Sequence, residues 1–188
     1  MPDLVLTRLD LTQLGARLNR REWHTFLACH ADQAGSRILW SWPSPGMILA
    51  QCGSSIDADL FPGLVSRSWS ASVRTKWVAD SLVRLSLIGN PIKQNHSGPR
   101  AIKTPLPPEQ WQGWLCRKLE GVVRLCEVAT EPLRPIRLRK SGETVTISLA
   151  GFYATGTVED PSRLAELISG GVGAGKAYGA GLLLVGEL

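Results

Sequence analysis

The stretch DPSRLAELISGGVGAGKAYGAGLLLV, from Asp160 to Val185, decides the fold. Asp160 followed by Pro161 predicts a helix start, with Asp as the N-cap and Pro at the first helical position, and the helix is expected to run to about Ile168. A loop with six glycines between Gly170 and Gly181 comes next. The residues from Gly181 to Val185 are then predicted to form a strand. The order is therefore helix, glycine loop, strand.

That order bears on the segment from Gly170 to Lys176, which matches the opening of a phosphate-binding P-loop. A working P-loop follows a buried strand and opens a helix, whose N-terminal amides face the phosphates. Here the order is reversed, and Ala177 stands where a Ser or Thr would hold Mg²⁺. A metabolic nucleotide-binding enzyme is therefore disfavoured.

The rest of the second half of the chain surrounds this stretch with further strands and one more helix. The helix is predicted over Pro108–Leu119, and a polar, basic connection over Asn90–Pro105. A Ser141-Gly142 turn is predicted inside a hairpin. Strands are predicted at Ser81–Ile88, Val122–Val128, Ile136–Lys140, Glu143–Leu149 and Gly151–Val158.

The first half of the chain has the same order of elements. Asn19 with Glu22 three residues later predicts a capped helix that runs to about Cys29, and Asp57–Leu64 is a weaker helix. Strands are predicted at Leu4–Leu9, Ile38–Trp42, Met47–Cys52 and Leu64–Arg74.

The first half thus follows the order β-α-β-β-α-β, and the second half repeats it with further strands between its two helices. This predicts an α+β protein of two tandem ferredoxin-like (RRM-like) units. Residues 1–78 form the expected N-terminal domain, and residues 79–188 form the expected C-terminal domain. Many RNA-binding modules share this topology.

Charge and composition indicate which class of partner the protein binds and where it is located. The formal net charge is +5, and the segment from Arg67 to Lys103 holds seven Lys or Arg residues against one acid. Such a concentration favours an anionic partner, nucleic acid first, although a solvated basic face is the alternative. The four cysteines lack zinc-finger spacing and are expected to be reduced and mostly buried. No signal peptide or membrane span is evident, so a cytoplasmic location is expected.

Several basic and glycine residues are candidates for RNA contact. The glycine loop would let bare backbone and its N–H groups approach a chain of phosphates, with a connector rich in positive-φ residues as the alternative. Alternating cations from Ile136 to Lys140 predict a hairpin with one cationic face, able to lie along a groove of a stem-loop. The seven tryptophans are expected to be core residues. The predicted RNA contacts are Arg20, Lys93, Arg100, Lys103, Arg137, Arg139, Lys140, Gly171, Gly173, Gly175, Lys176 and Tyr178.

Three stretches carry a resemblance to a known family over nearly the full chain. They are Asn19-Arg-Arg-Glu-Trp-His24 with Ile38-Leu-Trp40, then Leu85 to Lys93 with Arg100 and Lys103-Thr-Pro105, and finally Gly171 to Leu183. In order and spacing the chain resembles the CasE-type CRISPR RNA-processing endoribonucleases of type I-E Cascade complexes. The resemblance implies cutting of the CRISPR repeat RNA at the base of its hairpin without a metal or other cofactor. It also implies that the protein then stays on the guide RNA as a Cascade subunit, next to the backbone protein at the hairpin end.

The same resemblance puts the catalytic histidine at His24. Metal-free cleavage uses the 2′-hydroxyl of the RNA as nucleophile, and a histidine titrates in the range needed to move either proton. Some relatives have a tyrosine three residues before the histidine, where this chain has Arg21. Either Arg21 supplies charge to the transition state, or another group fills the role of the tyrosine, or the activity is weaker. The alternative is a subunit that binds the RNA hairpin without cutting it.

Overall fold

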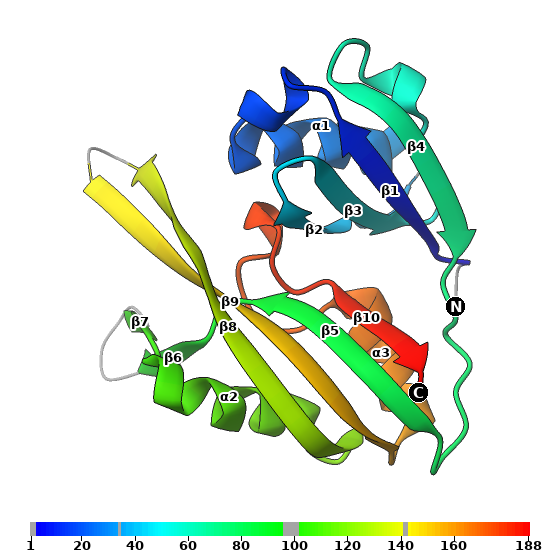
Figure 1. Ribbon diagram of the computed structural model, residues 1–188, viewed down its shortest axis with the longest axis vertical. Helices are drawn as coiled ribbons and strands as arrows, with labels where there is room; N and C mark the ends of the chain where they lie inside the picture. Colours follow the sequence, from blue (N-terminus) through cyan, green and yellow to red (C-terminus); the bar gives the residue numbers. More distant parts are fainter. Residues whose placement is uncertain (1–2, 34, 96–101, 141–142) are drawn as a thin grey trace.

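The computed structural model describes residues 3–33, 35–95, 102–140 and 143–188, and places them in two four-stranded antiparallel sheets (Figure 1). The N-terminal sheet has the order β2-β3-β1-β4 and the C-terminal sheet the order β10-β5-β9-β8. Relabelled within each unit, both orders are the same. The tandem ferredoxin-like fold predicted from the sequence is confirmed, while the division at residue 78 stays a prediction.

The N-terminal unit is built around one long helix, α1 (Arg20–Gln33). Trp23 and Leu27 of α1 pack with Leu9 and Ile48 of the sheet in one hydrophobic core. The strands are β1 (Val5–Leu11), β2 (Leu39–Ser44), β3 (Met47–Cys52) and β4 (Val65–Ser72). The short 3-10 helices η1 (Gly15–Arg17) and η2 (Ala58–Leu60) complete the unit.

The second predicted helix of this unit is shorter than the expected Asp57–Leu64. Asp57 does cap it, because its side chain accepts a hydrogen bond from the Asp59 N–H. The element nevertheless ends after one turn, as η2. Pro62 follows closely, and Gly63 has a φ of 75° that a helix cannot accommodate.

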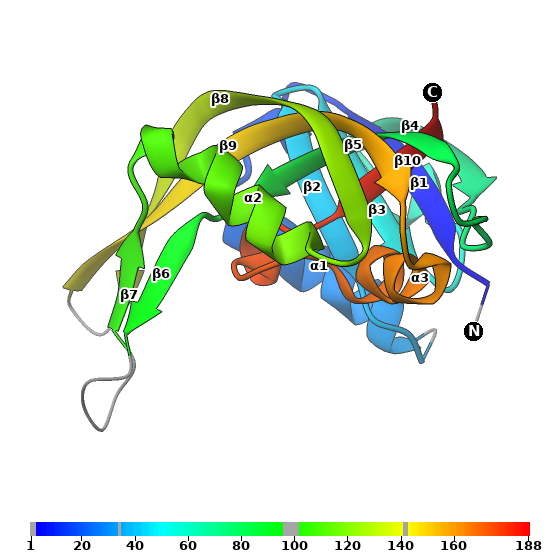
Figure 2. The ribbon, with the colours of Figure 1, turned by 90° about the horizontal axis from the view of Figure 1, so that it is seen from below.

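The C-terminal unit packs two helices, α2 (Trp111–Leu119) and α3 (Pro161–Gly170), against one face of its sheet (Figure 2). The strands are β5 (Leu82–Gly89), β8 (Val123–Lys140), β9 (Glu143–Val158) and β10 (Leu183–Glu187). Two short 3-10 helices, η3 (Pro108–Gln110) and η4 (Lys176–Tyr178), lie at the start of α2 and in the glycine loop.

Two predictions for this half were wrong in detail. The connection over Asn90–Pro105 contains a small hairpin of β6 (Ile92–Asn95) and β7 (Ile102–Pro105). The four strands expected between residues 122 and 158 are two long ones, β8 and β9. Pro135 lacks a backbone N–H, yet it lies at a register shift between Leu133 and Ile136, where a bulge lets the ladder continue past it.

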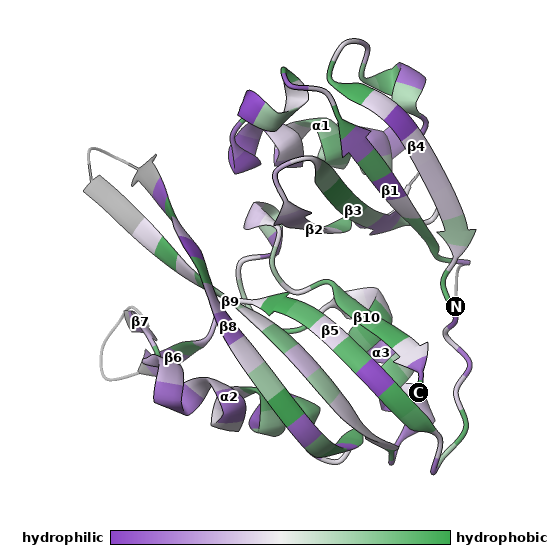
Figure 3. Cartoon of the chain, viewed as in Figure 1, coloured by the Kyte–Doolittle hydropathy of each residue, from purple (hydrophilic) through white to green (hydrophobic). Residues whose placement is uncertain are grey.

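The two hairpins, β6–β7 and β8–β9, project from the same end of the molecule (Figures 1 and 2). Hydrophilic residues recur along the outer half of β8, while the inner half carries the hydrophobic residues of the core (Figure 3). Arg100 and the Ser141-Gly142 turn lie outside the described residues. None of the described helices is long and apolar enough to cross a membrane.

The uncovered faces of the two sheets meet along a groove of about 820 Å³. Leu6 and Trp69 line it from the N-terminal sheet, and Tyr153 and Leu184 line it from the C-terminal sheet. Gln51 joins the two units across it, since its Nε2 donates to the Ile168 carbonyl at 2.7 Å.

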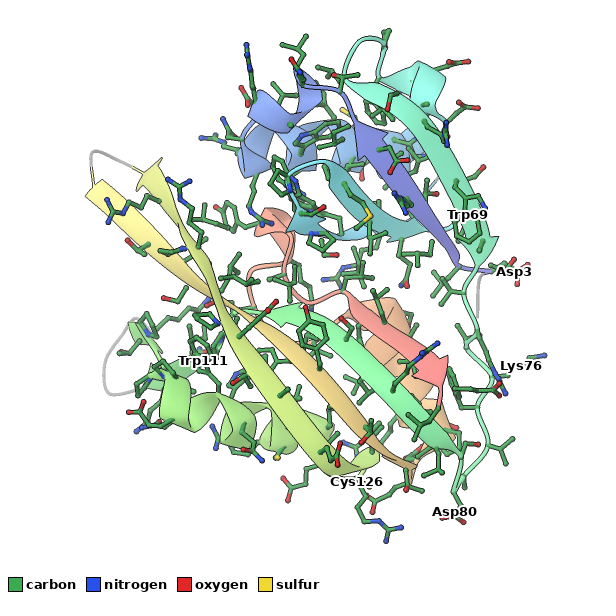
Figure 4. The ribbon with its side chains drawn as sticks, in the orientation of Figure 1. Asp3, Trp69, Lys76, Asp80, Trp111 and Cys126 are labelled. Atoms are coloured by element: carbon green, nitrogen blue, oxygen red, sulfur yellow. The ribbon has the colours of Figure 1, made fainter. Side chains whose placement is uncertain are left out.

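Two expectations about burial need correction. Trp69 is 63% exposed on the edge strand β4, so it is not a core residue (Figure 4). Of the cysteines, which are free thiols, Cys52 is buried, but Cys29, Cys116 and Cys126 are exposed. Each of these three side chains falls on the solvent side of its helix or strand, a matter of register that cysteine spacing does not reveal.

Candidate functional site

The start of α1 is fixed by a capping box, as the sequence predicts. The Asn19 side chain accepts hydrogen bonds from the Arg21 and Glu22 N–H groups at 2.9 and 3.1 Å. The Glu22 carboxylate in turn accepts from the Asn19 N–H at 2.7 Å. This reciprocal pair satisfies N–H groups that have no partner inside the helix. It thereby sets which residues fall on each face of α1.

Trp23 then fixes the rotation of that helix. Its side chain is fully buried, and its indole N–H donates to the Gly15 carbonyl at 3.1 Å. The next residue, His24, is consequently held at the edge of the core, where it is half-buried. Its Nδ1 is enclosed and has no hydrogen-bond partner within the described residues.

Burial also sets the protonation of His24. Desolvation disfavours the imidazolium and lowers the pKa of His24 from its usual 6.5. The neutral ring, which can accept a proton, is therefore favoured at pH 7. Arg21 is exposed on the first turn of the same helix, three residues before His24. Side chains at this spacing are neighbours on a helix surface.

The glycine loop between α3 and β10 meets this helix, and its backbone is well defined by hydrogen bonds. The Val172 N–H donates to the Gly181 carbonyl at 2.8 Å, and the Gly181 N–H donates to the Ile88 carbonyl at 2.7 Å. Gly175 and Gly179 flank η4 in left-handed conformations, with φ of 88° and 75°. The loop therefore has a defined conformation, and its left-handed φ values favour glycine at these two positions.

Close packing explains why residue 173 of the same loop is a glycine. A Cβ there would lie 2.9 Å from the Trp114 ring, so the backbone lies directly on the indole. The loop follows a helix and precedes a strand, as predicted. That arrangement is the reverse of a P-loop.

Lys176 has neighbours that the sequence did not reveal. Its side chain crosses the loop, with Cε 3.0 Å from the point where a Cβ on Gly171 would lie. Burial first, and then the charges of Arg37 and Lys118, lower the pKa of Lys176. Arg37 precedes β2 and Lys118 belongs to α2, so three elements bring positive charge together. No local pattern could have predicted this cluster, because its members are far apart in the chain.

Arg20, predicted to contact RNA, is engaged within the protein. Its guanidinium donates to the Tyr178 carbonyl at 3.1 Å and to the Trp42 carbonyl at 3.3 Å. It also lies over the rings of Trp40 and Trp42, 5.9 and 5.4 Å from their centroids. Since residues four apart share a helix face, Arg20 and His24 lie on the side of α1 that meets the glycine loop.

The remaining candidates lie on the two projecting hairpins. Lys93 of β6 and Lys103 of β7 are exposed, and so is Arg137 on the outer half of β8. Arg139 and Lys140 continue the backbone of β8 and pair with Thr144 and Glu143 of β9. The structure thus joins Arg20 to the glycine loop, with His24 one helical turn further along the same face of α1, while the hairpin cations belong to separate elements.

The fold and this site together define a class: a tandem ferredoxin-like protein whose first helix carries a half-buried histidine and meets a glycine-rich loop. The sequence model of a family described as CRISPR associated protein matches residues 7–186. The chain therefore belongs to the CRISPR-associated protein family. Among curated proteins, no match was found.

Solved structures agree with this assignment. Thermus thermophilus Cse3, bound to an RNA that represents a pre-cleavage complex, has a TM-score of 0.81 and 25% identity, covering 98% of this chain and 100% of that chain. CRISPR endoribonuclease Cse3 bound to a 19-nucleotide RNA has a TM-score of 0.82 and 26% identity, covering 100% of both chains.

A third structure extends the agreement in fold. Cas6e from Escherichia coli strain K-12 has a TM-score of 0.74 at 21% identity, covering 98% of this chain and 100% of that chain. The resemblance to CasE-type proteins that the sequence predicted is confirmed by these matches.

Proposed function

We propose that this protein is an endoribonuclease that processes CRISPR precursor RNA in the cytoplasm, cutting at the base of the repeat hairpin without a metal ion. After cutting it stays on the guide RNA hairpin as a Cascade subunit, beside the backbone protein at the hairpin end. The observation that carries the proposal is the half-buried His24, whose pKa is lowered, on the helix face that meets the glycine loop. The likeness to RNA-bound Cse3 supports it.

The proposed reaction is an internal transfer at phosphorus. The 2′-hydroxyl oxygen attacks the adjacent phosphate, the bond to the 5′-oxygen of the next nucleotide breaks, and a 2′,3′-cyclic phosphate and a 5′-hydroxyl result. One proton leaves the 2′-hydroxyl and one joins the 5′-oxygen. Neutral His24 is suited to accept the first of these protons. Arg21 is close enough along the helix to offset charge on the phosphorane.

The RNA is held by groups that surround His24 and by the hairpins. The backbone at Gly171, Gly173 and Gly175 and the charge of Lys176 face the phosphates, and Tyr178 stacks on a base. The amides of Gly173 and Gly175 are the donors, because the Gly171 N–H already donates to the Leu167 carbonyl at 2.8 Å. Cations of the two hairpins bind the RNA stem. They are Lys93 and Lys103 on β6 and β7, Arg100 between these two strands, and Arg137, Arg139 and Lys140 on β8.

The experiment that tests the function incubates wild-type protein with the cognate repeat RNA in EDTA. We expect one cut, giving a 2′,3′-cyclic phosphate and a 5′-hydroxyl. The control RNA carries 2′-deoxy nucleotides at the base of the hairpin and should bind equally well without being cut. Tight binding with no cutting of either RNA would instead identify a hairpin-binding subunit, which Arg21 in place of the relatives' tyrosine favours as the second candidate. Cutting of the deoxy RNA would contradict 2′-hydroxyl attack.

Arg137 gives a separate prediction for RNA binding. Because the exposed guanidinium contacts phosphate, Arg137→Gln should reduce the slope of log Kd against log salt by about 1, and should do so for any stem sequence. Binding is measured by titration at several salt concentrations, with the uncut deoxy RNA. Arg163→Gln on α3 is the matched control, since it removes the same charge from an exposed position away from the hairpins. Equal slopes for the two variants would remove Arg137 from the RNA interface.

A further inference from the structure

Arg20 is a partly buried cation, and within the described ranges no carboxylate forms an ion pair with it. Among the described residues the ion pairs are Arg8–Asp10 and Arg74–Glu187, both on the surface. Burial lowers the pKa of Arg20 to about 10, so the guanidinium remains charged at pH 7. A buried charge is costly unless other groups compensate it. Here two carbonyl oxygens and two indole rings do so.

These compensating groups come from both units. Trp40 and Trp42 belong to β2 of the N-terminal sheet, whereas the Tyr178 carbonyl belongs to the glycine loop of the C-terminal unit. Arg20 itself opens α1. The guanidinium therefore joins three segments that are separated by up to 158 residues in the sequence.

Gly179 shows how closely the loop approaches this group. A Cβ at residue 179 would lie 2.6 Å from Nη1 of Arg20 and 3.1 Å from the Trp40 ring. Its φ of 75° is also one that favours glycine. The loop backbone thus rests on the guanidinium and the indole, without room for a side chain.

We propose that Arg20 is a positioning residue that holds the glycine-rich loop at a fixed place relative to His24, one helical turn away. This inference rests on the proposed function, in which the loop binds the RNA and His24 moves the proton. The loop can bind RNA and His24 can accept a proton independently of each other, but cutting requires the loop and His24 at a fixed distance from one another. A displacement of about 1 Å in such an arrangement can cost about 100-fold in rate.

The first test uses the free protein. Hydrogen exchange of the amides from Gly175 to Gly181 is compared between wild type, Arg20→Ala and Gly179→Ala. Both variants should speed exchange in this loop and leave the β5–β9 ladder unchanged. Gly179→Ala is informative because it displaces the guanidinium without removing a charge. Unchanged exchange in both variants would overturn the inference.

The second test measures cutting and binding separately. At saturating RNA in a single turnover, both variants should cut about 10- to 100-fold more slowly. The salt slope of their Kd for the deoxy RNA should match wild type, because neither substitution removes a phosphate contact. The double variant should be no slower than the slower single variant, because both changes break the same contact. Arg20→Lys should remain slow, since an ammonium lacks the planar fork that reaches two carbonyls.

Two other outcomes would contradict the proposals, and they can be told apart. A salt slope reduced by about 1 in Arg20→Ala, with full recovery in Arg20→Lys, would make Arg20 a phosphate contact and overturn the positioning role. If wild-type protein does not cut the RNA at all, the proposed function fails. The exchange measurement then still decides whether Arg20 holds the loop.

Discussion

His24→Ala is expected to slow cutting of the repeat RNA by about 100- to 10,000-fold in EDTA, which is the usual contribution of a positioned acid or base. The Kd for the uncut deoxy RNA should stay within about twofold of wild type, because the phosphate contacts assigned to the glycine loop and the hairpins are retained. Single-turnover rates at saturating RNA measure the first quantity, and titration measures the second.

His30 provides the matched control on the same helix. It lies in the last turn of α1, where its Nε2 is 3.4 Å from the Ser54 hydroxyl. His30→Ala removes an imidazole of the same kind and should leave the cutting rate near that of wild type. If both variants cut like wild type, His24 is not the catalytic group, even though the protein is a nuclease.

Trp114→Ala is expected to lower the free energy of unfolding by about 3–5 kcal/mol, the usual cost of removing a buried tryptophan. The indole is 3% exposed and stacks on Phe152 with 5.2 Å between ring centroids. Gly89 and Gly173 lie against it so closely that a Cβ on either would be about 3 Å from the ring. The cavity would therefore loosen the support of the glycine loop as well as the core. Urea denaturation, read from the midpoint, measures the change.

Trp69→Ala is the control for that measurement. Trp69 is the same residue type on a strand edge and is 63% exposed, so its loss should change stability by no more than about 0.5 kcal/mol. Equal destabilisation by the two substitutions would contradict the assignment of Trp114 to the centre of the C-terminal core.

Local sequence patterns were sufficient for most of the fold. The Asn19–Glu22 box and the Asp160-Pro161 pair each place a helix start, since capping depends on a few adjacent residues. Strand lengths were harder to predict from local patterns. The strand β8 continues through Pro135 because a bulge in its pairing with β9 accommodates the proline. The exposure of Trp69 was also missed, since alternation identifies two faces of a strand but not which face is covered.

The sequence by itself determined the order of elements, the two-unit plan, the placement of the glycine loop after a helix, and the position of His24. These depend on caps, periodicity and turn residues, which act over a few positions. Only the tertiary structure decided that Arg20 packs between Trp40, Trp42 and the loop, and that Arg37 and Lys118 lie near Lys176. Such groupings arise when distant segments pack together, and burial then changes what a charged side chain can contact and how readily it holds its proton.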